Sequence, residues 1–379
     1  MKKALIYASV ASMIQQFNMN NIILLQDMGY EVDVACNFEL GSTISNDKIE
    51  QLKRNLMRIN VKYFHLPIPR KVTMLKDLWL AYTQSKKLMN REGYDLIHCH
   101  SPIGGLICRE ANKHSCYYNH TKIIYTAHGF HFYKKNSPLK NFIFRNIEKH
   151  AARYTNILIT INREDYEAAK KFKLKQYGKV KYIPGVGIDI DYINSVKGDK
   201  QSLCLELNIS VTSILLLSVG ELNTNKNHKI IIEALPKLPV DVHYLICGIG
   251  PLKDYYEKLA KNLGVTNRLH FLGYRNDVIR IMKSCDIFVF PSLREGLSVS
   301  LMEALACGMT CIASEIRGNN DLIISNENGF LISGTDSSSW VDRLCLCIKK
   351  DTIKIKQKDM KEFSTKDIEM RMKDIYKEE

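Results

Sequence analysis

The sequence predicts an α/β protein with two doubly wound domains, and three observations carry this prediction. The chain has 379 residues, more than a single hydrophobic core usually supports. Short apolar, β-branched runs alternate with amphipathic, helix-like stretches throughout, which is typical of parallel sheets covered on both faces. The runs form two series, because one proline and two glycines interrupt the pattern at residues 184–191, PGVGIDID.

The strand candidates divide the chain. The first series lies at residues 3–10, 31–36, 95–100, 122–129, 156–162 and 179–185, and the second at 213–220, 243–250, 268–274, 287–292 and 310–316. We therefore expect an N-terminal domain over 1–185, a C-terminal domain over 186–350 and a helical tail over 351–379 that can pack back on the N-terminal domain. Open α/β sheets bind ligands at the carboxyl ends of their strands, so we expect the two sheets to face a cleft.

The composition is that of an ordinary globular protein, with 45% hydrophobic and 25% charged residues. No apolar run reaches the ~18 to 20 residues that a membrane-spanning helix needs, and the first stretch becomes polar too soon for a signal peptide. The eleven cysteines are scattered and include no CxxC, which favours reduced thiols over disulfides or zinc. We expect an intracellular protein.

The net charge of +14 belongs to the first half of the chain. Residues 1–185 hold 29 Lys+Arg and 14 Asp+Glu, a balance of +15, whereas residues 186–379 hold 25 and 26, a balance of −1. Basic surface can serve solubility alone, but a one-sided basic domain also indicates nucleic acid or an acidic membrane surface as partner. Segment 134–154 interleaves six Lys/Arg with apolar residues at helical spacing. It fits a helix resting on anionic lipid as well as one packed on the core.

Two glutamates, Glu295 and Glu303, flank the expected start of the helix after strand candidate 287–292. That helix should begin near Leu297 or Ser298, with the serine as its cap. At ~1.5 Å per helical residue, the carboxylates would be on the order of 10 Å apart. Backbone N–H groups at a helix N-terminus attract a diphosphate, and carboxylates accept hydrogen bonds from diols, so the layout fits a nucleotide sugar. A pair of acids across a scissile bond would instead fit hydrolysis.

The stretch E-GLSVSLM-E at 295–303, followed by ALACG, resembles the E-x7-E signature of glycosyltransferase family 4, which has the GT-B fold of two Rossmann-like domains. The resemblance covers nearly the whole chain and points to the branch that builds bacterial capsular and exopolysaccharides. The other motifs that carry it are DLIHCHSPIGG (95–105), YTAHGFHFYKK (125–135), LITINREDYEAAKKF (158–172), YIPGVGID (182–189), SVGELNTNKNH (218–228) and FLGYRNDV (271–278).

On the donor side, the resemblance implies that Glu295 contacts hydroxyls of the donor sugar and that Glu303 binds the ribose. Lys226 matches the family's diphosphate-binding lysine, but Glu221 stands where the family has an arginine. An acid there would repel a diphosphate unless it turns away. The other donor-side residues that we expect are Gly220, Gly296, Leu297, Ser298 and a substitute base, Arg275 or Arg317.

On the acceptor side, the resemblance places His128 beside the anomeric carbon, so we expect it at the catalytic centre with Glu295 and Lys226. His100, Gly129 and Phe130 are the expected acceptor-side residues. His98 and His100 alternate on one strand face like half of a metal site. No third ligand is evident, and the family needs no metal, so we expect neither metal nor cofactor.

Two further patterns imitate binding motifs. Asp189-x-Asp191 resembles the DxD that holds a cation in the other major glycosyltransferase fold, but it lies in the expected linker, where capping explains it better. Gly248-x-Gly250 lacks the third glycine of a dinucleotide-binding fingerprint.

The combined expectation is a retaining, metal-independent glycosyltransferase. It would move a hexosyl or N-acetylhexosaminyl group from a UDP-sugar to a polyprenyl-diphosphate saccharide at the inner face of the cell membrane, for surface polysaccharide synthesis. A UDP-sugar 2-epimerase, which also has two Rossmann-like domains, and a basic nucleic-acid-binding protein remain as alternatives. No nucleic-acid-binding motif is recognisable, so we expect no nucleic acid as partner.

Overall fold

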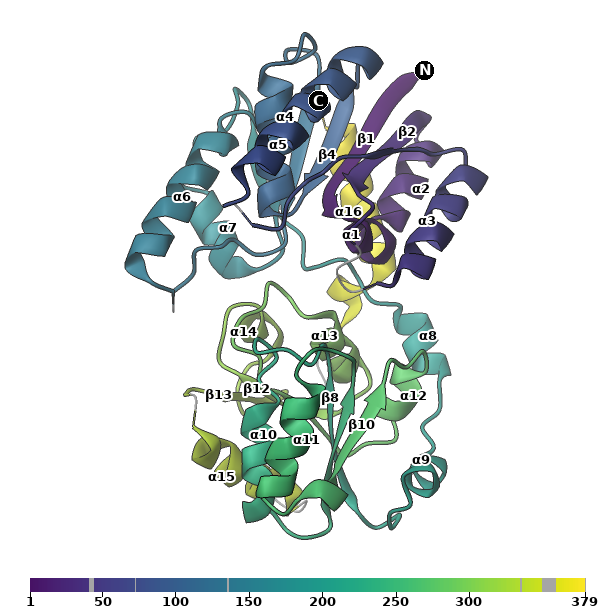
Figure 1. Ribbon diagram of the computed structural model, residues 1–379, viewed down its shortest axis with the longest axis vertical. Coiled ribbons are helices and arrows are strands. Elements are labelled where there is room, and N and C mark those ends of the chain that lie inside the picture. Colours follow the sequence, from purple (N-terminus) through teal and green to yellow (C-terminus); the bar gives the residue numbers. More distant parts are fainter. Residues whose placement is uncertain (41–43, 72, 135, 335, 350–358, 379) are drawn as a thin grey trace. The chain divides into compact units, whose positions relative to one another are not determined.

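The computed structural model describes residues 1–40, 44–71, 73–134, 136–334, 336–349 and 359–378 (Figure 1). The chain divides into two compact units. The first contains Met1–Val186 and Ile368–Glu379, and the second contains Gly187–Asp367. Part of the tail expected over 351–379 lies outside the described residues. The rest contains a helix that begins in the second unit and ends in the first.

The first unit is built on a seven-stranded parallel sheet with the order β3-β2-β1-β4-β5-β6-β7. The strand order reverses direction between β1 and β4, as in doubly wound folds. The strands are β1 (Lys2–Val10), β2 (Tyr30–Asn37), β3 (Lys62–His65), β4 (Leu96–His100), β5 (Lys122–Ala127), β6 (Ile157–Thr160) and β7 (Lys179–Tyr182).

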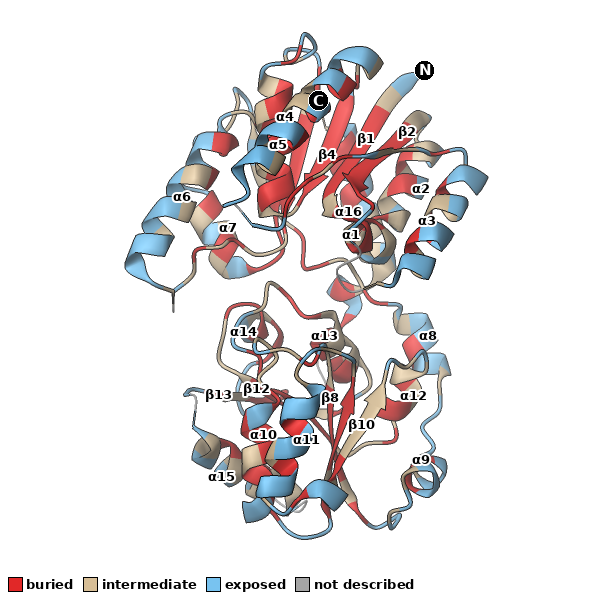
Figure 2. Ribbon diagram, viewed as in Figure 1, coloured by how far each residue is buried: buried red, intermediate tan, exposed pale blue. Residues whose placement is uncertain are grey.

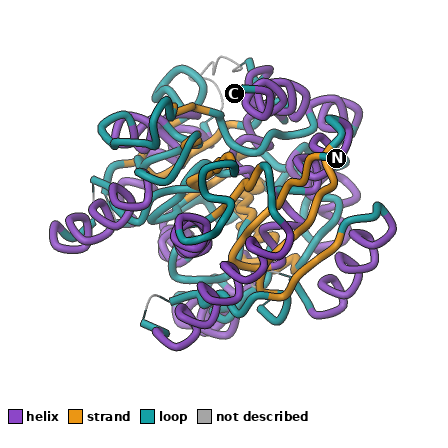
Figure 3. Tube along the Cα trace, turned by 90° about the horizontal axis from the view of Figure 1, so that it is seen from above, coloured by secondary structure: helices purple, strands orange, loops and turns teal. Residues whose placement is uncertain are grey.

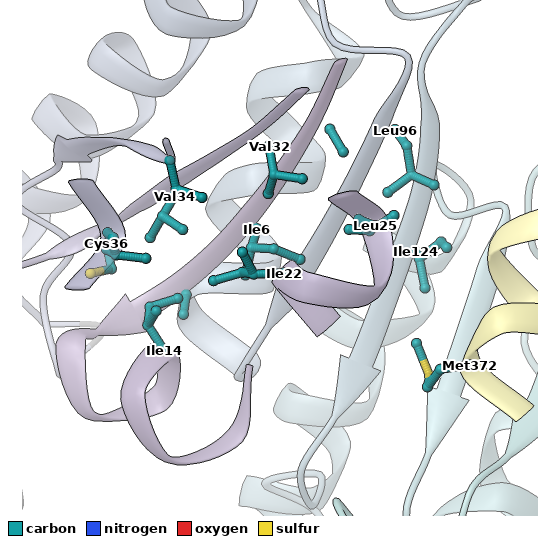
Figure 4. Close-up of a cluster of buried hydrophobic side chains, with 14 of the residues drawn as sticks. Ile6, Ile14, Ile22, Leu25, Val32, Val34, Cys36, Leu96, Ile124 and Met372 are labelled. Carbon is teal, nitrogen blue, oxygen red and sulfur yellow. The ribbon is translucent and has the colours of Figure 1, made fainter. Parts of the chain in front are cut away.

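Helices pack on both faces of this sheet, each over its own buried core. One core joins the strands to α1 (Ala11–Phe17), α2 (Met19–Asp27), α3 (Asn46–Arg58) and α16 (Thr365–Lys377). Ile6, Ile22 and Met372 of this core come from β1, α2 and α16 (Figure 4). The other core joins the strands to α4 (Leu75–Glu92), α5 (Pro102–Lys113), α6 (Pro138–Ala152) and α7 (Arg163–Ala169).

The second unit repeats this plan with a six-stranded parallel sheet, in the order β10-β9-β8-β11-β12-β13. Its order reverses between β8 and β11. The strands are β8 (Ile214–Val219), β9 (Val242–Cys247), β10 (Leu269–Gly273), β11 (Ile287–Phe290), β12 (Thr310–Ser314) and β13 (Phe330–Ile332).

The helices of the second unit also pack on their sheet. Figure 3 shows the strands of the protein, in orange, surrounded by helices. A buried core joins the strands to α10 (Lys229–Ala234), α11 (Lys253–Asn262) and α15 (Ser337–Ile348). Helix α13 (Val299–Ala306) packs on β11 and β12 and contacts α8 and α12. The remaining helices are α8 (Ile190–Ser195), α9 (Lys200–Leu207), α12 (Val278–Met282), α14 (Asn319–Leu322) and 3₁₀ turns at Leu235–Lys237, Thr266–Arg268 and Lys361–Phe363.

The structure confirms the predicted fold class and all eleven predicted strands, but it contains two more. β3 and β13 are edge strands, and their sequences escape the apolar pattern for different reasons. β3 reads KYFH with no fully buried residue, and β13 spans only Phe330–Ile332. An edge strand has one neighbour and needs fewer apolar residues than a central one.

Candidate functional site

Most of the sequence-predicted site residues follow strands at, or next to, the point where the strand order of each sheet reverses. Lys226 follows β8, and Glu295 and Glu303 follow β11, its neighbour across the reversal. In the first unit, His100 ends β4 and His128 follows β5. Neighbouring strands diverge into helices on opposite faces at such a reversal, which leaves room for a ligand at their carboxyl ends.

Lys226 and Glu295 form an ion pair in the second unit. The Lys226 Nζ lies 2.8 Å from the Glu295 Oε1 and 4.7 Å from the centre of the Phe290 ring. The two charged side chains are 19% and 16% exposed, so solvent screens the pair only partly. The structure therefore brings two of the predicted catalytic residues into direct contact.

Side-chain amides hold the loops that carry this pair. The Asn223 Oδ1 accepts a hydrogen bond from the Lys226 backbone N–H at 2.9 Å. The Asn225 Nδ2 donates to the Arg294 carbonyl at 2.9 Å, and the Leu293 N–H donates to the Asn225 carbonyl at 2.8 Å. Sequence reasoning missed these asparagines, although two asparagines within three residues of Lys226, in the segment after a strand, are themselves a turn signal.

Glycines let neighbouring loops approach this site closely. A Cβ at Gly248 would lie 1.9 Å from the Gly220 carbonyl oxygen, and one at Gly318 would lie 2.2 Å from the Gly296 carbonyl oxygen. Gly318 also has φ +82°, a left-handed conformation that favours glycine. Gly220 itself leaves space for the Lys226 stem, whose Cε would lie 2.9 Å from an added Cβ.

Helix α13 begins where the sequence predicted, with Ser298 as its N-cap. The Ser298 side chain accepts a hydrogen bond from the Leu301 N–H at 3.3 Å. Among the described residues, none accepts a hydrogen bond from the backbone N–H groups of Gly296, Leu297 or Ser298. The helix dipole adds partial positive charge at the same place. The loop therefore offers unengaged donors beside the Lys226–Glu295 pair.

Glu303 lies one turn inside α13 and is largely buried. Burial raises the pKa of its carboxyl to about 7. Within the described parts of the chain, its carboxylate has no hydrogen-bond or ion-pair partner. A buried carboxylate without a donor is costly, and hydroxyl groups of a bound ligand would supply the missing hydrogen bonds.

Glu221, the acid at the arginine position, is exposed. Its exposed carboxylate accepts a hydrogen bond from the Asn223 Nδ2 at 3.0 Å. Arg275 is held by acids on two sides, with its Nε 2.8 Å from Asp277 and its Nη1 2.7 Å from Glu206. These pairings favour a structural role for Arg275, and its assignment to the donor remains an untested prediction.

Arg317 is a second basic residue beside Glu295, in addition to Lys226. It is mostly buried, and its Nε donates to the Glu295 carbonyl at 3.3 Å. Of the two candidate substitutes for the missing arginine, only Arg317 is in contact with the predicted donor residues. Sequence patterns offer no basis for this choice, because the contact joins the loops after two neighbouring strands.

In the first unit, His98, His100 and His128 form a chain of neighbouring imidazoles, of which those of His98 and His100 are buried and that of His128 is partly buried. The His100 Nδ1 lies 3.1 Å from the His128 Nε2, and the His98 and His100 ring centres are 4.1 Å apart. Burial lowers the pKa of His98 to about 3 and that of His128 to about 4. The rings are therefore neutral at physiological pH. His98 uses both ring nitrogens, one to Tyr376 of α16 and one to Thr126, each at 2.8 Å.

Phe130, one of the expected acceptor-side residues, has its side chain in the core of the first unit. Phe130 is fully buried in the core and stacks on Phe132, with ring centres 4.7 Å apart. Its backbone N–H donates to the Asp165 carboxylate at 3.0 Å. The residue alternates inward just after β5, so Gly129, with φ +120°, and His128 are the positions of this motif outside the core.

The DxD pattern proves to be a helix cap, as interpreted from the sequence. The Asp189 side chain accepts a hydrogen bond from the Tyr192 N–H at 2.9 Å and caps α8. Asp191 pairs with Lys366 at 2.6 Å.

Two family models match the chain in succession. The model described as Glycosyltransferase Family 4 matches residues 20–192, and the model described as Glycosyl transferases group 1 matches residues 202–367. The second match contains Lys226, Glu295 and Glu303, and the first contains His100 and His128. No helix in the described ranges has both the length and the apolar character to cross a membrane.

Known proteins resemble the chain over most of its length. The Bacillus subtilis (strain 168) protein EpsD, which carries the name of a glycosyltransferase, is 32% identical over 90% of this chain and 86% of its own length. An Escherichia coli protein named UDP-Gal:alpha-D-GlcNAc-diphosphoundecaprenol alpha-1,3-galactosyltransferase is 29% identical over 75% of this chain and 74% of its own.

A solved structure shares the fold. Anabaena Alr3699/HepE, crystallised in complex with UDP and glucose, superposes with a TM-score of 0.74 at 19% identity, over 99% of each chain. This likeness establishes the GT-B architecture of the two sheets. The matching family models and the identity with EpsD show that the chain belongs to glycosyltransferase family 4.

Proposed function

We propose that the protein is a retaining glycosyltransferase that moves a hexosyl or N-acetylhexosaminyl group from a UDP-sugar to a polyprenyl-diphosphate saccharide. The UDP-Gal donor and the diphosphoundecaprenol acceptor in the name of the Escherichia coli relative support both substrate classes. UDP bound to Alr3699/HepE supports the nucleotide. The relationship to EpsD supports a role in surface polysaccharide synthesis.

One observation carries the donor site. Unengaged N–H groups at the start of α13 stand between the Lys226–Glu295 pair and the unpartnered carboxylate of Glu303. A diphosphate would accept hydrogen bonds from these N–H groups and from Lys226. The ribose hydroxyls would donate to Glu303, and the sugar hydroxyls would donate to Glu295.

The transfer breaks the bond between the anomeric carbon and the diphosphate oxygen and forms a bond from that carbon to the acceptor oxygen. In the retaining reaction, the acceptor attacks from the face that the diphosphate leaves, and its hydroxyl proton passes to the leaving diphosphate. Lys226 and the N-terminus of α13 stabilise the charge that develops on the diphosphate. Arg317, next to Glu295, takes the place of the missing arginine. The reaction as proposed needs neither metal ion nor cofactor.

The acceptor side lies in the first unit. His128 remains the residue that we assign beside the anomeric carbon, with Gly129 and His100 on the acceptor side. Because its imidazole is neutral, His128 serves as a hydrogen-bond partner of sugar hydroxyls rather than as a cation.

The decisive experiment measures UDP release and product formation from a panel of UDP-sugars with polyprenyl-diphosphate saccharides. Glu295→Ala should abolish transfer while circular dichroism and the unfolding midpoint stay close to the wild type. Glu257→Ala, at an exposed position of α11, is the matched control. Full transfer by Glu295→Ala would remove the proposed donor site, and conversion of a UDP-sugar without acceptor would indicate an epimerase.

The acceptor lipid implies a membrane, which we propose that the protein meets from the cytoplasmic side, and α6 supports a contact with anionic lipid. Leu139, Phe142 and Ile143 in its first turns are exposed, while Glu148 of its buried side pairs with Arg109 at 3.0 Å. The helix thus packs on the core and also presents apolar residues to its surroundings. Exposed apolar residues within a basic helix fit an anionic lipid surface.

Vesicle binding tests this contact. Lys140→Glu with Lys149→Glu should weaken sedimentation with anionic vesicles, and salt should weaken wild-type binding. The control pair Lys258→Glu and Lys261→Glu changes charge equally on α11 of the second unit. Equal binding by both pairs would eliminate α6 as the contact.

A further inference from the structure

The first turns of α4 expose a large apolar surface. Leu75 and Trp79 are 73% and 68% exposed, and Met74 and Leu80 are exposed as well. Residues four apart are neighbours on a helix, so Leu75 and Trp79 form one continuous patch, called here the α4 tip. Monomeric proteins rarely leave such patches uncovered without a function.

Basic residues surround the α4 tip. The segment 66–90 carries five Lys/Arg and a single acid, Asp77. Lys71, Lys76 and Lys87 are exposed. The patch therefore combines an aromatic and aliphatic centre with positive charge, a composition typical of a surface that meets anionic headgroups and the outer acyl chains.

The fold places the α4 tip at the same edge of the sheet as the exposed end of α6. Helix α4 follows β3 and α6 follows β5, and both strands belong to one parallel sheet whose carboxyl ends share an edge. Both helices contribute to the same core on one face of the sheet, and α5 contacts each of them. In Figure 2, α6 is exposed along most of its length. Its exposed apolar residues are also in its first turns.

We propose that the α4 tip inserts into the interface of an anionic bilayer. Together with α6 it makes a two-point contact that turns the carboxyl edge of the first sheet toward the lipid. The purpose of this contact rests on the proposed transfer to a lipid-linked acceptor. The orientation would hold His128, which follows β5 at that edge, near the level of a headgroup-linked saccharide.

A bilayer suits this surface better than a second copy of the chain. Two copies docked through the α4 tip would bring their exposed lysines together, and like charges repel. Anionic headgroups attract the same lysines, and tryptophan is enriched at the membrane–water interface. An anionic bilayer therefore suits both the exposed lysines and the exposed tryptophan of the α4 tip.

The chain supplies its own probe, because it contains two tryptophans. Trp79 is exposed, whereas Trp340 is 1% exposed in the core of the second unit. With vesicles of phosphatidylcholine and phosphatidylglycerol, we expect a blue shift of the emission and quenching by lipids brominated in the acyl chain. Trp79→Phe should remove both signals and leave the constant emission of Trp340.

Partitioning measures the strength of insertion. Leu75→Ser with Trp79→Ser should lower the vesicle partition coefficient at least roughly tenfold, because both side chains lose their burial in lipid. Leu205→Ser is the control, since Leu205 is 82% exposed on α9 of the second unit. Both substitutions are at exposed positions, and unchanged circular dichroism will verify folding.

Three outcomes would overturn the inference. They are an absence of Trp79 quenching on anionic vesicles, equal partitioning of the Leu75/Trp79 and Leu205 variants, and self-association in sedimentation that Trp79→Ser abolishes. Insertion and transfer are separable readouts. Transfer without Trp79 insertion would remove this inference alone, and insertion without transfer would remove the proposed function alone.

Discussion

The two units place opposite kinds of polar group at the carboxyl ends of similar sheets. The second unit carries Lys226, Glu295 and Glu303, which are charged or titrate near neutrality. The first unit carries His98, His100 and His128, which burial keeps neutral. In the proposed transfer, the diphosphate of the donor needs charge that can be redirected to it, whereas a neutral acceptor saccharide needs fixed hydrogen-bonding groups. The comparison teaches that one architecture can serve both by varying a few strand-end residues.

Removing the charge of Lys226 in the second unit should have the largest effect, which is on the rate of transfer. Lys226→Met should lower kcat/KM for the donor roughly a thousandfold, because a charge-assisted contact to the leaving diphosphate is lost and Glu295 loses its partner. Steady-state kinetics with a UDP-sugar measures this. Lys229→Met, at the exposed start of α10, is the control and should be almost silent. A Lys226→Met enzyme within a few-fold of the wild type would place the diphosphate elsewhere.

The neutral histidines should make the first unit sensitive to acid. Their folded pKa values lie below the unfolded value of about 6.5, so the unfolded state binds more protons as the pH falls through that value. Their stabilising contribution is complete above pH 6.5 and declines below it. Relative to pH 7, the free energy of unfolding at pH 5 should be lower by about 2 kcal/mol because of His98 alone.

Urea unfolding at pH 7 and pH 5 measures this cost. In His98→Phe, the difference in unfolding free energy between pH 7 and pH 5 should be smaller than in the wild type. In His120→Phe, at an exposed position, this difference should equal that of the wild type. An unchanged difference in His98→Phe would mean that the ring is charged in the folded protein.

The pH dependence of UDP binding near neutrality should come from the carboxyl group of Glu303 in the second unit. Its carboxylate accepts from the ribose in the proposed complex, so UDP affinity should decline as the pH falls through about 7. Glu303→Gln should bind UDP roughly tenfold more weakly at pH 8 and lose most of this pH dependence. Calorimetric titration at pH 6 and pH 8 tests both. A pH dependence retained in Glu303→Gln and lost in His128→Gln would reverse the assignment.

The smallest effect, on unfolding free energy, concerns the hydrogen bond between Tyr376 and His98. Tyr376→Phe removes the hydroxyl bonded to the His98 Nδ1 and leaves that buried nitrogen unsatisfied, which should cost about 1 to 2 kcal/mol of unfolding free energy. Tyr177→Phe, at an 88% exposed position, is the control. Equal stability of the two variants would show that the Tyr376 hydroxyl contributes nothing to the histidine chain.

The sequence predicted features that depend on local pattern, and it failed where tertiary contacts decide. Continuous apolar runs identified the central strands, and a serine before an apolar stretch identified the cap of α13. The choice of Arg317 over Arg275 depended on contacts between distant loops. The apolar spacing of α4 indicates a helix but not which turns remain uncovered, so Trp79 could not be distinguished from a core residue. The motif around Phe130 likewise did not indicate that this side chain is buried in the core.

The final helix has a consequence for how the protein is made. The second unit, Gly187–Asp367, is one uninterrupted stretch of chain, whereas the first unit needs Ile368–Glu379 for completion. Ile368, Met372 and Ile375 fill a core begun by β1 and α2. During synthesis from the N-terminus, the first unit to begin is therefore the last to be completed, and its core stays partly open while the whole second unit emerges. A ribosome that stops before residue 368 would release a chain whose second unit can fold and whose first unit exposes apolar surface to aggregation.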